Sequence, residues 1–78
     1  MPKVIVYSTP SCPFCMKTKQ FLKAHNIEFE DIDASADREK AEEMIRKSGQ
    51  TGVPVIDVDG NIVIGYNVPK LKELLNIK

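Results

Sequence analysis

Tryptophan is absent from this chain of 78 residues, which has one histidine and only two cysteines. Two cysteines are too few for the disulfide framework that braces a small secreted domain. A structural zinc ion needs four ligands, and on a helix His25 would lie roughly 15 Å from Cys15 along the axis. The composition therefore argues against a disulfide scaffold and against a zinc site within one chain, and the same distance excludes His25 as a catalytic base for the cysteines.

Charge of one sign does not dominate, because eleven Lys and Arg residues balance eleven Asp and Glu residues. A neutral protein lacks the positive field that attracts nucleic-acid backbones and anionic membranes. No apolar run approaches the roughly 20 residues that span a bilayer, and Met1-Pro2-Lys3 leads into strand-like sequence instead of a signal peptide. We therefore expect a cytoplasmic monomer that binds neither nucleic acid nor membrane.

The charges are nevertheless unevenly spread along the chain. Residues 1–27 hold four lysines and no acid, whereas residues 28–43 hold eight acids and two basic residues. Solvated helix faces are the simpler interpretation. The alternative is a mildly positive environment around the cysteines, which would favour a thiolate.

Residues 1–78 are predicted to form a single domain, because a chain of this length builds one compact core. Residues 3–7 are a β-branched run without alternation, which is typical of a central strand covered on both faces. Pro13 suits the first position of a helix, so a helix is expected to begin beside Cys12. Residues 27–32 alternate well enough for a second strand, and their acids indicate the edge of a sheet.

The second half of the chain predicts a helix, a hairpin and a last helix. Residues 37–48 carry apolar side chains at helical spacing. Asp59-Gly60 suits the two-residue turn of a β-hairpin between residues 55–58 and 61–64, and a final amphipathic helix has Pro69 in its first turn. The order βαβαββα predicts an α/β fold with a mixed four-stranded sheet flanked by helices.

Cys12-Pro13-Phe14-Cys15 is the motif that carries chemistry. It opens the first predicted helix, so both sulfurs lie at one helix end, placed to form a disulfide. A sulfur at a helix N-terminus faces unpaired backbone N–H groups and the positive end of the dipole, which stabilise its anion. Cys12 is therefore the candidate nucleophile. Cys15, one turn inside the helix, is the candidate resolving thiol.

Other interpretations of these residues stay open at this point. A purely structural disulfide is unattractive, because so small a loop removes little chain entropy. A module in which the dithiols of two chains hold a zinc ion or an iron–sulfur cluster is the alternative from a different class. Phe14 is expected to be exposed, where it contacts a partner or adjusts the redox potential. Tyr7 and Tyr66 are candidates to flank the dithiol, with packing as the alternative for each.

Around these residues the sequence resembles a glutaredoxin over essentially the whole chain. The resemblance rests on Tyr7-Ser8-Thr9-Pro10-Ser11-Cys12-Pro13-Phe14-Cys15, on Thr51-Gly52-Val53-Pro54, and on the hairpin with the Gly65-Tyr66 that follows it. Residues 48–56 most resemble the small YruB-like branch, and Ile64-Gly65-Tyr66 also resembles the NrdH redoxins. This resemblance implies the thioredoxin-like (glutaredoxin) fold and a thiol–disulfide oxidoreductase.

The resemblance also implies that Val53-Pro54 is a cis peptide facing the cysteines. The Val53 backbone would then pair with an extended peptide or with glutathione, and Pro54 would keep metals away from the dithiol. From the residues alone, Pro54 could simply begin a strand, because only about 5–6% of X-Pro bonds in folded proteins are cis. The partner-binding surface that we expect comprises Ser11, Pro13, Phe14, Thr51, Gly52, Val53, Pro54, Gly65 and Tyr66.

Two segments depart from the glutaredoxins that bind glutathione. Those proteins commonly have a lysine where this chain has Thr9, and a Gly-Gly-x-Asp-type segment where it has Ile64-Gly65-Tyr66-Asn67-Val68. Both differences remove groups that hold the charged ends of glutathione. We therefore expect a reductase of disulfide-containing proteins, with no bound cofactor, that is re-reduced by a thioredoxin-reductase-type flavoprotein. Reduction by glutathione is the alternative.

The chain resembles conventional thioredoxins less closely. No tryptophan precedes the first cysteine, and residues 1–27 contain no acid. We therefore expect no carboxylate from the first strand beneath the thiols.

Overall fold

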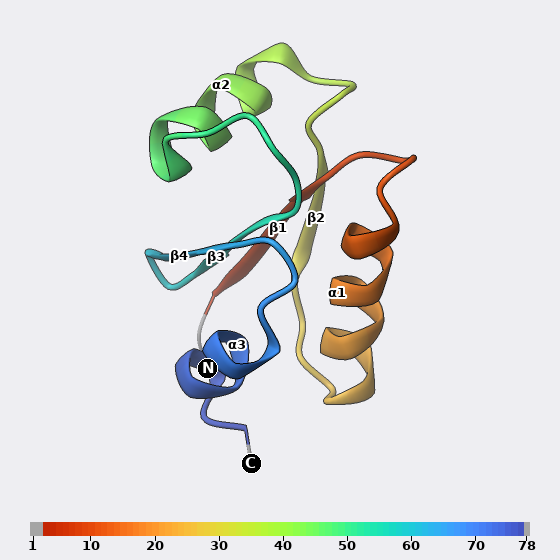
Figure 1. The fold of residues 1–78 in the computed structure, drawn as a ribbon, viewed down its shortest axis with the longest axis vertical. Helices are drawn as coiled ribbons and strands as arrows, with labels where there is room; N and C mark the ends of the chain where they lie inside the picture. The colour runs from red at the N-terminus through yellow and green to blue at the C-terminus, as the bar shows by residue number, and fades with distance from the viewer. Residues whose placement is uncertain (1–2, 78) are drawn as a thin grey trace.

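The computed structural model describes residues 3–77, which form a four-stranded sheet and three helices (Figure 1). This arrangement confirms the predicted α/β class and the βαβαββα order. The elements are, in chain order, β1 (Val4–Ser8), α1 (Pro13–Ala24), β2 (Glu30–Asp33), α2 (Arg38–Ser48), β3 (Val55–Val58), β4 (Asn61–Ile64) and α3 (Val68–Leu75).

The sheet has the strand order β2-β1-β3-β4, so β1 is a central strand, as its β-branched run predicts. It pairs in parallel with β2 and antiparallel with β3. The β3–β4 hairpin turns at Asp59 and Gly60, which have φ angles of 54° and 93°. Such positive angles are those of a two-residue hairpin turn, which confirms the prediction from Asp59-Gly60.

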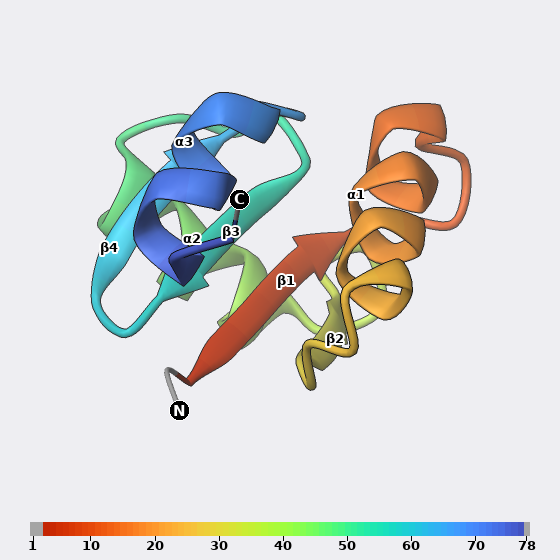
Figure 2. The same ribbon diagram turned by 90° about the horizontal axis from the view of Figure 1, so that it is seen from below.

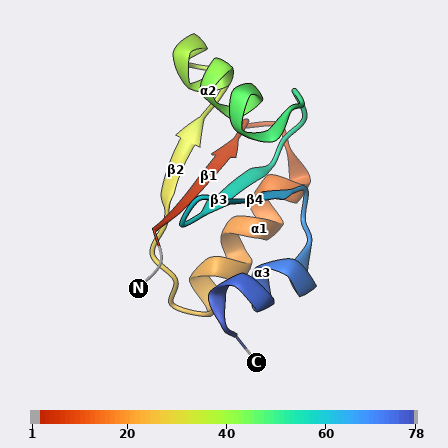
Figure 3. The same ribbon diagram turned by 90° about the vertical axis from the view of Figure 1, so that its left-hand side faces the viewer.

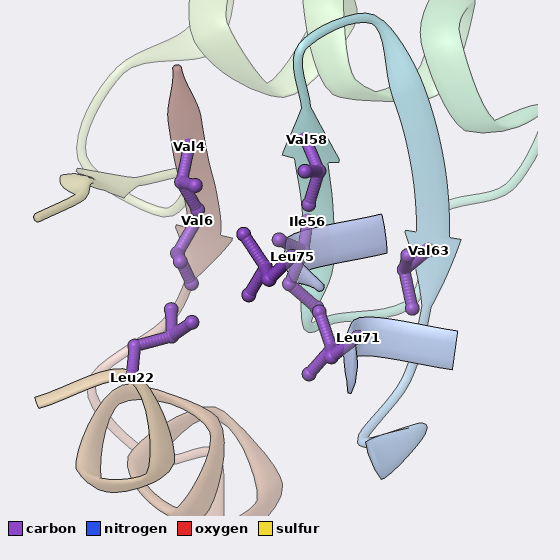
Figure 4. Packing of buried hydrophobic residues seen from close by; sticks show 8 residues of the cluster. All are labelled: Val4, Val6, Leu22, Ile56, Val58, Val63, Leu71 and Leu75. Atoms are coloured by element: carbon purple, nitrogen blue, oxygen red, sulfur yellow. The ribbon is translucent and has the colours of Figure 1, made fainter. Parts of the chain in front are cut away.

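Helices cover both faces of the sheet. Helices α1 and α3 lie on one face, and α2 lies on the other (Figures 2 and 3). Because neighbouring residues of a strand point to opposite faces, β1 contributes to two clusters. The larger cluster, between the sheet and α1 with α3, is shown in Figure 4 and comprises Val4, Val6, Leu22, Ile56, Val58, Val63, Leu71 and Leu75.

The second strand differs from its prediction. It spans Glu30–Asp33 and not residues 27–32. Ile27 and Phe29 pack against the core on the α1 side, whereas Ile32 packs against the cluster on the α2 side. The apolar positions therefore change face within the segment, so simple alternation misplaced the boundary. The edge position of this strand is confirmed.

A partly buried ion pair connects α2 to the sheet. Lys47 Nζ donates hydrogen bonds of 2.8 Å to Asp57 Oδ2 and to the Tyr7 hydroxyl. The bonds to Asp57 and Tyr7 raise the pKa of Lys47. Burial acts to raise the pKa of Asp57, but the bonds from Lys47 and from the Gly60 N–H outweigh it and leave that pKa below its ordinary value.

Tyr7 belongs to this cluster of Lys47 and Asp57, which we call the Lys47–Asp57 anchor, and not to an exposed surface. Its side chain is fully buried in the cluster on the α2 face, together with Met44 and Val55. Of the two alternatives for Tyr7, packing is therefore the correct one.

Candidate functional site

Cys12 occupies the position that the sequence predicts, at the N-terminus of α1. Its backbone is extended, with φ −100° and ψ 108°, and Pro13 is the first residue of the helix. The Cys15 N–H donates to Cys12 Sγ over 3.1 Å, so the sulfur caps the helix. A backbone N–H and the positive end of the helix dipole both favour negative charge on this sulfur.

Cys15 has a contrasting environment one turn into the helix. Both cysteines are free, but Cys12 is half-buried whereas Cys15 is fully buried. Burial, together with the side-chain hydrogen bond that it shares with Cys12, raises the pKa of the Cys15 thiol to about 11. The two sulfurs therefore differ in access, and burial opposes ionisation of Cys15, which suits a nucleophile at Cys12 and a resolving thiol at Cys15.

A segment from the second half of the chain lies beside Cys12 and is bonded to a second segment. The Cys12 thiol points at the Val53 carbonyl oxygen, with 3.8 Å between sulfur and oxygen. The Val53-Pro54 peptide bond is cis, as the family resemblance implies. The Gly65 N–H donates to the Pro54 carbonyl oxygen over 2.9 Å. Val53-Pro54 thus lies beside Cys12 and holds the start of the Gly65-Tyr66 segment.

The predicted partner-binding residues differ in their exposure. Val53 and Gly65 are half-buried, and Pro54 is fully buried, so the Pro54 side chain is covered in the free protein. Phe14 is 56% exposed, as expected for a residue between the two cysteines. The remaining members are also exposed, namely Ser11, Pro13, Thr51, Gly52 and Tyr66.

The N-termini of α1 and α3, which border this surface, carry no acid, and a lysine lies beside Phe14. Lys17 Nζ lies 5.4 Å from the centroid of the Phe14 ring. Neither α1 nor α3 has an acidic residue in its first turn. In α3 the side-chain oxygen of Asn67 is used to cap the helix, because it accepts a hydrogen bond from the Lys70 N–H at 3.2 Å. No carboxylate at either of these helix ends is therefore available to bind an ammonium group.

A polar cluster beneath α1 was missed by sequence reasoning. Ser8 Oγ donates to Asp31 Oδ1 over 3.0 Å, and Lys19 Nζ donates to Asp31 Oδ2 over 3.1 Å. Strand β1 contributes no carboxylate, as expected, but β2 does, because Asp31 lies opposite Val6 in the sheet register. The acids of residues 27–32 were interpreted only as a sign of a sheet edge, so the contacts of Asp31 with Ser8 and Lys19 were not predicted.

Within residues 3–77, no three His, Cys, Asp or Glu side chains are grouped so that they could hold a metal ion. None of the helices described there is long and apolar enough to cross a membrane.

Comparisons with known proteins agree with this geometry. The Glutaredoxin family model matches residues 4–63. A glutaredoxin-like protein of 8.6 kDa in the rubredoxin operon of Clostridium pasteurianum is 49% identical over 70 residues, which cover 90% of this chain and 93% of that protein.

Solved structures show the same fold. A mutant of the thioredoxin-like protein BC3987 superposes with a TM-score of 0.92 at 35% identity and covers 100% of both chains. The glutaredoxin-like NrdH-redoxin of Escherichia coli gives a TM-score of 0.83 at 24% identity, over 92% of this chain and 93% of its own. By its sequence match and its thioredoxin-like architecture, this chain belongs to the glutaredoxin family.

Proposed function

We propose that this protein is a dithiol thiol–disulfide oxidoreductase that reduces disulfide bonds in protein partners. The observation that carries the proposal is the asymmetry of the two sulfurs. Cys12 is accessible and receives a backbone hydrogen bond, whereas Cys15 is buried and has a raised pKa. An exposed thiolate attacks, and a hidden thiol within reach resolves.

In the first step the Cys12 thiolate attacks one sulfur of the partner disulfide. The Cys12–partner sulfur bond forms, the partner disulfide breaks, and the released partner thiolate takes a proton from water. The Cys15 N–H that donates to Cys12 Sγ stabilises the attacking anion. The Val53 backbone beside Cys12 would align an extended partner segment.

In the second step Cys15 loses its proton and attacks Cys12. The Cys12–Cys15 disulfide forms, and the second partner thiolate leaves and is protonated. Two electrons pass from the two cysteines to the partner, so one partner disulfide becomes two thiols. The oxidised protein then needs an external donor of two electrons.

A thioredoxin-reductase-type flavoprotein fits this protein better as donor than glutathione does. Glutathione carries two carboxylates and an ammonium group that need charged contacts. Thr9 replaces the family's lysine, and α3 begins with Val68 and Pro69, with no acid in its first turn. The proposed surface therefore suits an uncharged peptide backbone more than a small zwitterion.

Two coupled assays test the choice of donor. Insulin would be reduced with NADPH and thioredoxin reductase or, separately, with NADPH, glutathione and glutathione reductase. We expect turnover in the flavoprotein arm to be at least about tenfold faster, because each missing charge-assisted contact to glutathione is worth ~1.5–3 kcal/mol. The double variant Thr9→Lys with Val68→Asp should raise the rate in the glutathione arm.

Faster turnover of the unmodified protein with glutathione would overturn this choice.

Metal analysis and sizing of the freshly purified protein test the alternative of a metal- or cluster-bridged module. A bridged dimer with bound metal would replace the proposed function, whereas a metal-free monomer agrees with it. The cytoplasmic location stays a prediction.

A further inference from the structure

The charges of helix α1 all have one sign. The helix holds Lys17, Lys19 and Lys23 and no acid, whereas α2 mixes both signs and forms three ion pairs within the helix. Pairs of opposite charge three or four residues apart stabilise a solvated helix. Lys19 and Lys23 are instead like charges at this spacing, which destabilises a helix. A sequence that breaks such a local rule is expected where the surface has a further role.

Two of the three lysines keep their charge available. Lys19 Nζ lies 3.1 Å from Asp31 Oδ2, so this lysine is already paired. Within residues 3–77, neither Lys17 nor Lys23 takes part in an ion pair, and both are exposed. A carboxylate that meets these two ammonium groups must therefore come from another molecule.

Exposed apolar side chains accompany these lysines. Phe14 is 56% exposed and Met16 is 55% exposed, which makes them the two most exposed large apolar residues that the structure describes. Lys17 Nζ lies 5.4 Å from the centroid of the Phe14 ring, a cation–π contact that holds the ammonium beside the ring. Exposed apolar surface with a polar rim is typical of a site that binds another protein.

A hollow beside Met16 gives this surface depth. It has a volume of about 360 Å³ and lies between α1 and the segment that leads into β2. Ligand pockets begin at about 300 Å³, so the hollow has room for one large side chain of a partner. The lining combines two apolar residues with polar side chains and comprises Met16, Lys19, Gln20, Lys23, Phe29 and Asp31.

The position of this surface relative to Cys12 follows from the helix geometry. At about 1.5 Å per residue, Lys17 lies roughly 7.5 Å from Cys12 along the axis and Lys23 roughly 16.5 Å. An extended partner segment advances about 3.3 Å per residue, so acids about two and about five residues from the attacked cysteine would reach the two lysines. No other described helix or strand covers the outer side of α1 (Figures 1 and 2).

We propose that the exposed side of α1 docks an acidic segment of the partner protein whose disulfide is reduced. The segment supplies carboxylates to the two available lysines and one apolar side chain to the hollow. The inference rests on the proposed function and names its class of partner, namely a protein whose disulfide lies beside acidic residues. The α1 docking surface comprises Phe14, Met16, Lys17, Gln20 and Lys23.

The test uses the reduced full-length protein and three synthetic peptides, each with one intramolecular disulfide. The disulfide is flanked on both sides by a leucine and by glutamates, glutamines or lysines, and chromatography measures the second-order rate of reduction. Rates with dithiothreitol correct for the effect of the flanking charges on the disulfide itself. We expect the glutamate peptide to react about five- to tenfold faster than the glutamine peptide at low salt, and within about twofold of it at about 0.5 M salt.

Charge reversal separates docking from changes in folding. In the double variant Lys17→Glu with Lys23→Glu the preference should invert, so that the lysine peptide reacts fastest, and unfolding cannot produce this result. In Lys17→Gln with Lys23→Gln the preference should shrink to within about twofold. Arg46→Gln removes an exposed basic residue of α2 and should leave the preference as it is.

The hollow has a test of its own. Replacement of the leucine in the glutamate peptide by alanine should slow its reduction severalfold. In Met16→Gln this difference between the leucine and alanine peptides should disappear, because the apolar wall of the hollow is lost. Met16 is more than half exposed, so the fold should tolerate the change.

Equal rates for the glutamate and glutamine peptides would overturn the inference. A preference that survives charge reversal of Lys17 and Lys23, or that Arg46→Gln weakens as strongly as their neutralisation does, would also overturn it. Failure of the proposed function has a different signature, since the unmodified protein would then reduce none of the peptides.

Discussion

Replacement of Cys12 by serine should reduce disulfide reduction to the uncatalysed rate. Cys12 is the half-buried sulfur at the start of α1, and its Sγ accepts the Cys15 N–H at 3.1 Å. A serine hydroxyl can take over this cap, so the fold should survive. Cys15 cannot substitute for the lost nucleophile, because it is fully buried and mostly protonated at neutral pH.

Replacement of Cys15 by serine should instead trap the partner as a covalent complex. Cys12 still attacks, but nothing within the protein displaces the partner, so mixed disulfides accumulate to near one per molecule. Non-reducing electrophoresis and mass spectrometry of each variant with oxidised insulin measure the adduct. A variant without both cysteines is the control for background. Adducts on Cys15 in the Cys12→Ser protein would contradict the assigned roles.

Replacement of Lys47 by methionine should produce a large loss of stability. Asp57 would remain nearly buried, with its side chain 11% exposed and its ammonium partner gone. We expect a loss of about 2–3 kcal/mol in the free energy of unfolding, and a fall of roughly 10–20 °C in Tm. This is less than the ~3–5 kcal/mol of a fully buried pair, because 29% of the Lys47 side chain reaches solvent.

The pH dependence of this loss follows from the pKa directions. Asp57 has a lowered pKa in the folded protein, so its stabilisation is present above about pH 4 and is lost as the pH falls through the folded value. Lys47 has a raised pKa, so its contribution persists through neutral pH and is lost only at strongly alkaline pH. The deficit of Lys47→Met should thus be largest near pH 7 and smaller at pH 3.

Urea unfolding at both pH values measures this deficit. Arg46→Met removes the neighbouring exposed basic residue and should cost less than about 0.5 kcal/mol. Lys47→Arg keeps the charge and should recover part of the lost stability. A deficit in Lys47→Met that is equal at pH 3 and pH 7, or equal to that of Arg46→Met, would contradict the stabilising role of the Lys47–Asp57 ion pair.

Local signals in the sequence were enough to predict the position of Cys12 at the start of α1 and the turn of the hairpin. Pro13 begins α1 and places Cys12 at its N-terminus, as expected from the preference of proline for the first helical position. Asp59 and Gly60 form the hairpin turn for a similar reason, since their backbones tolerate positive φ angles. In each case the residues that carry the signal are the residues that adopt the geometry. The family resemblance added Val53-Pro54, for which no local signal exists.

Long-range packing decided the rest. Which acid lies beneath α1 depends on the pairing of β2 with β1, and a shift of one residue would turn Asp31 to the other face. The sequence by itself determined the start of α1, the hairpin and the order of the two sulfurs along one helix. Only the tertiary structure placed Asp31 beside Lys19 and Asp57 beside Lys47, because the two members of each pair come from different elements and no local pattern in the sequence predicts their contact.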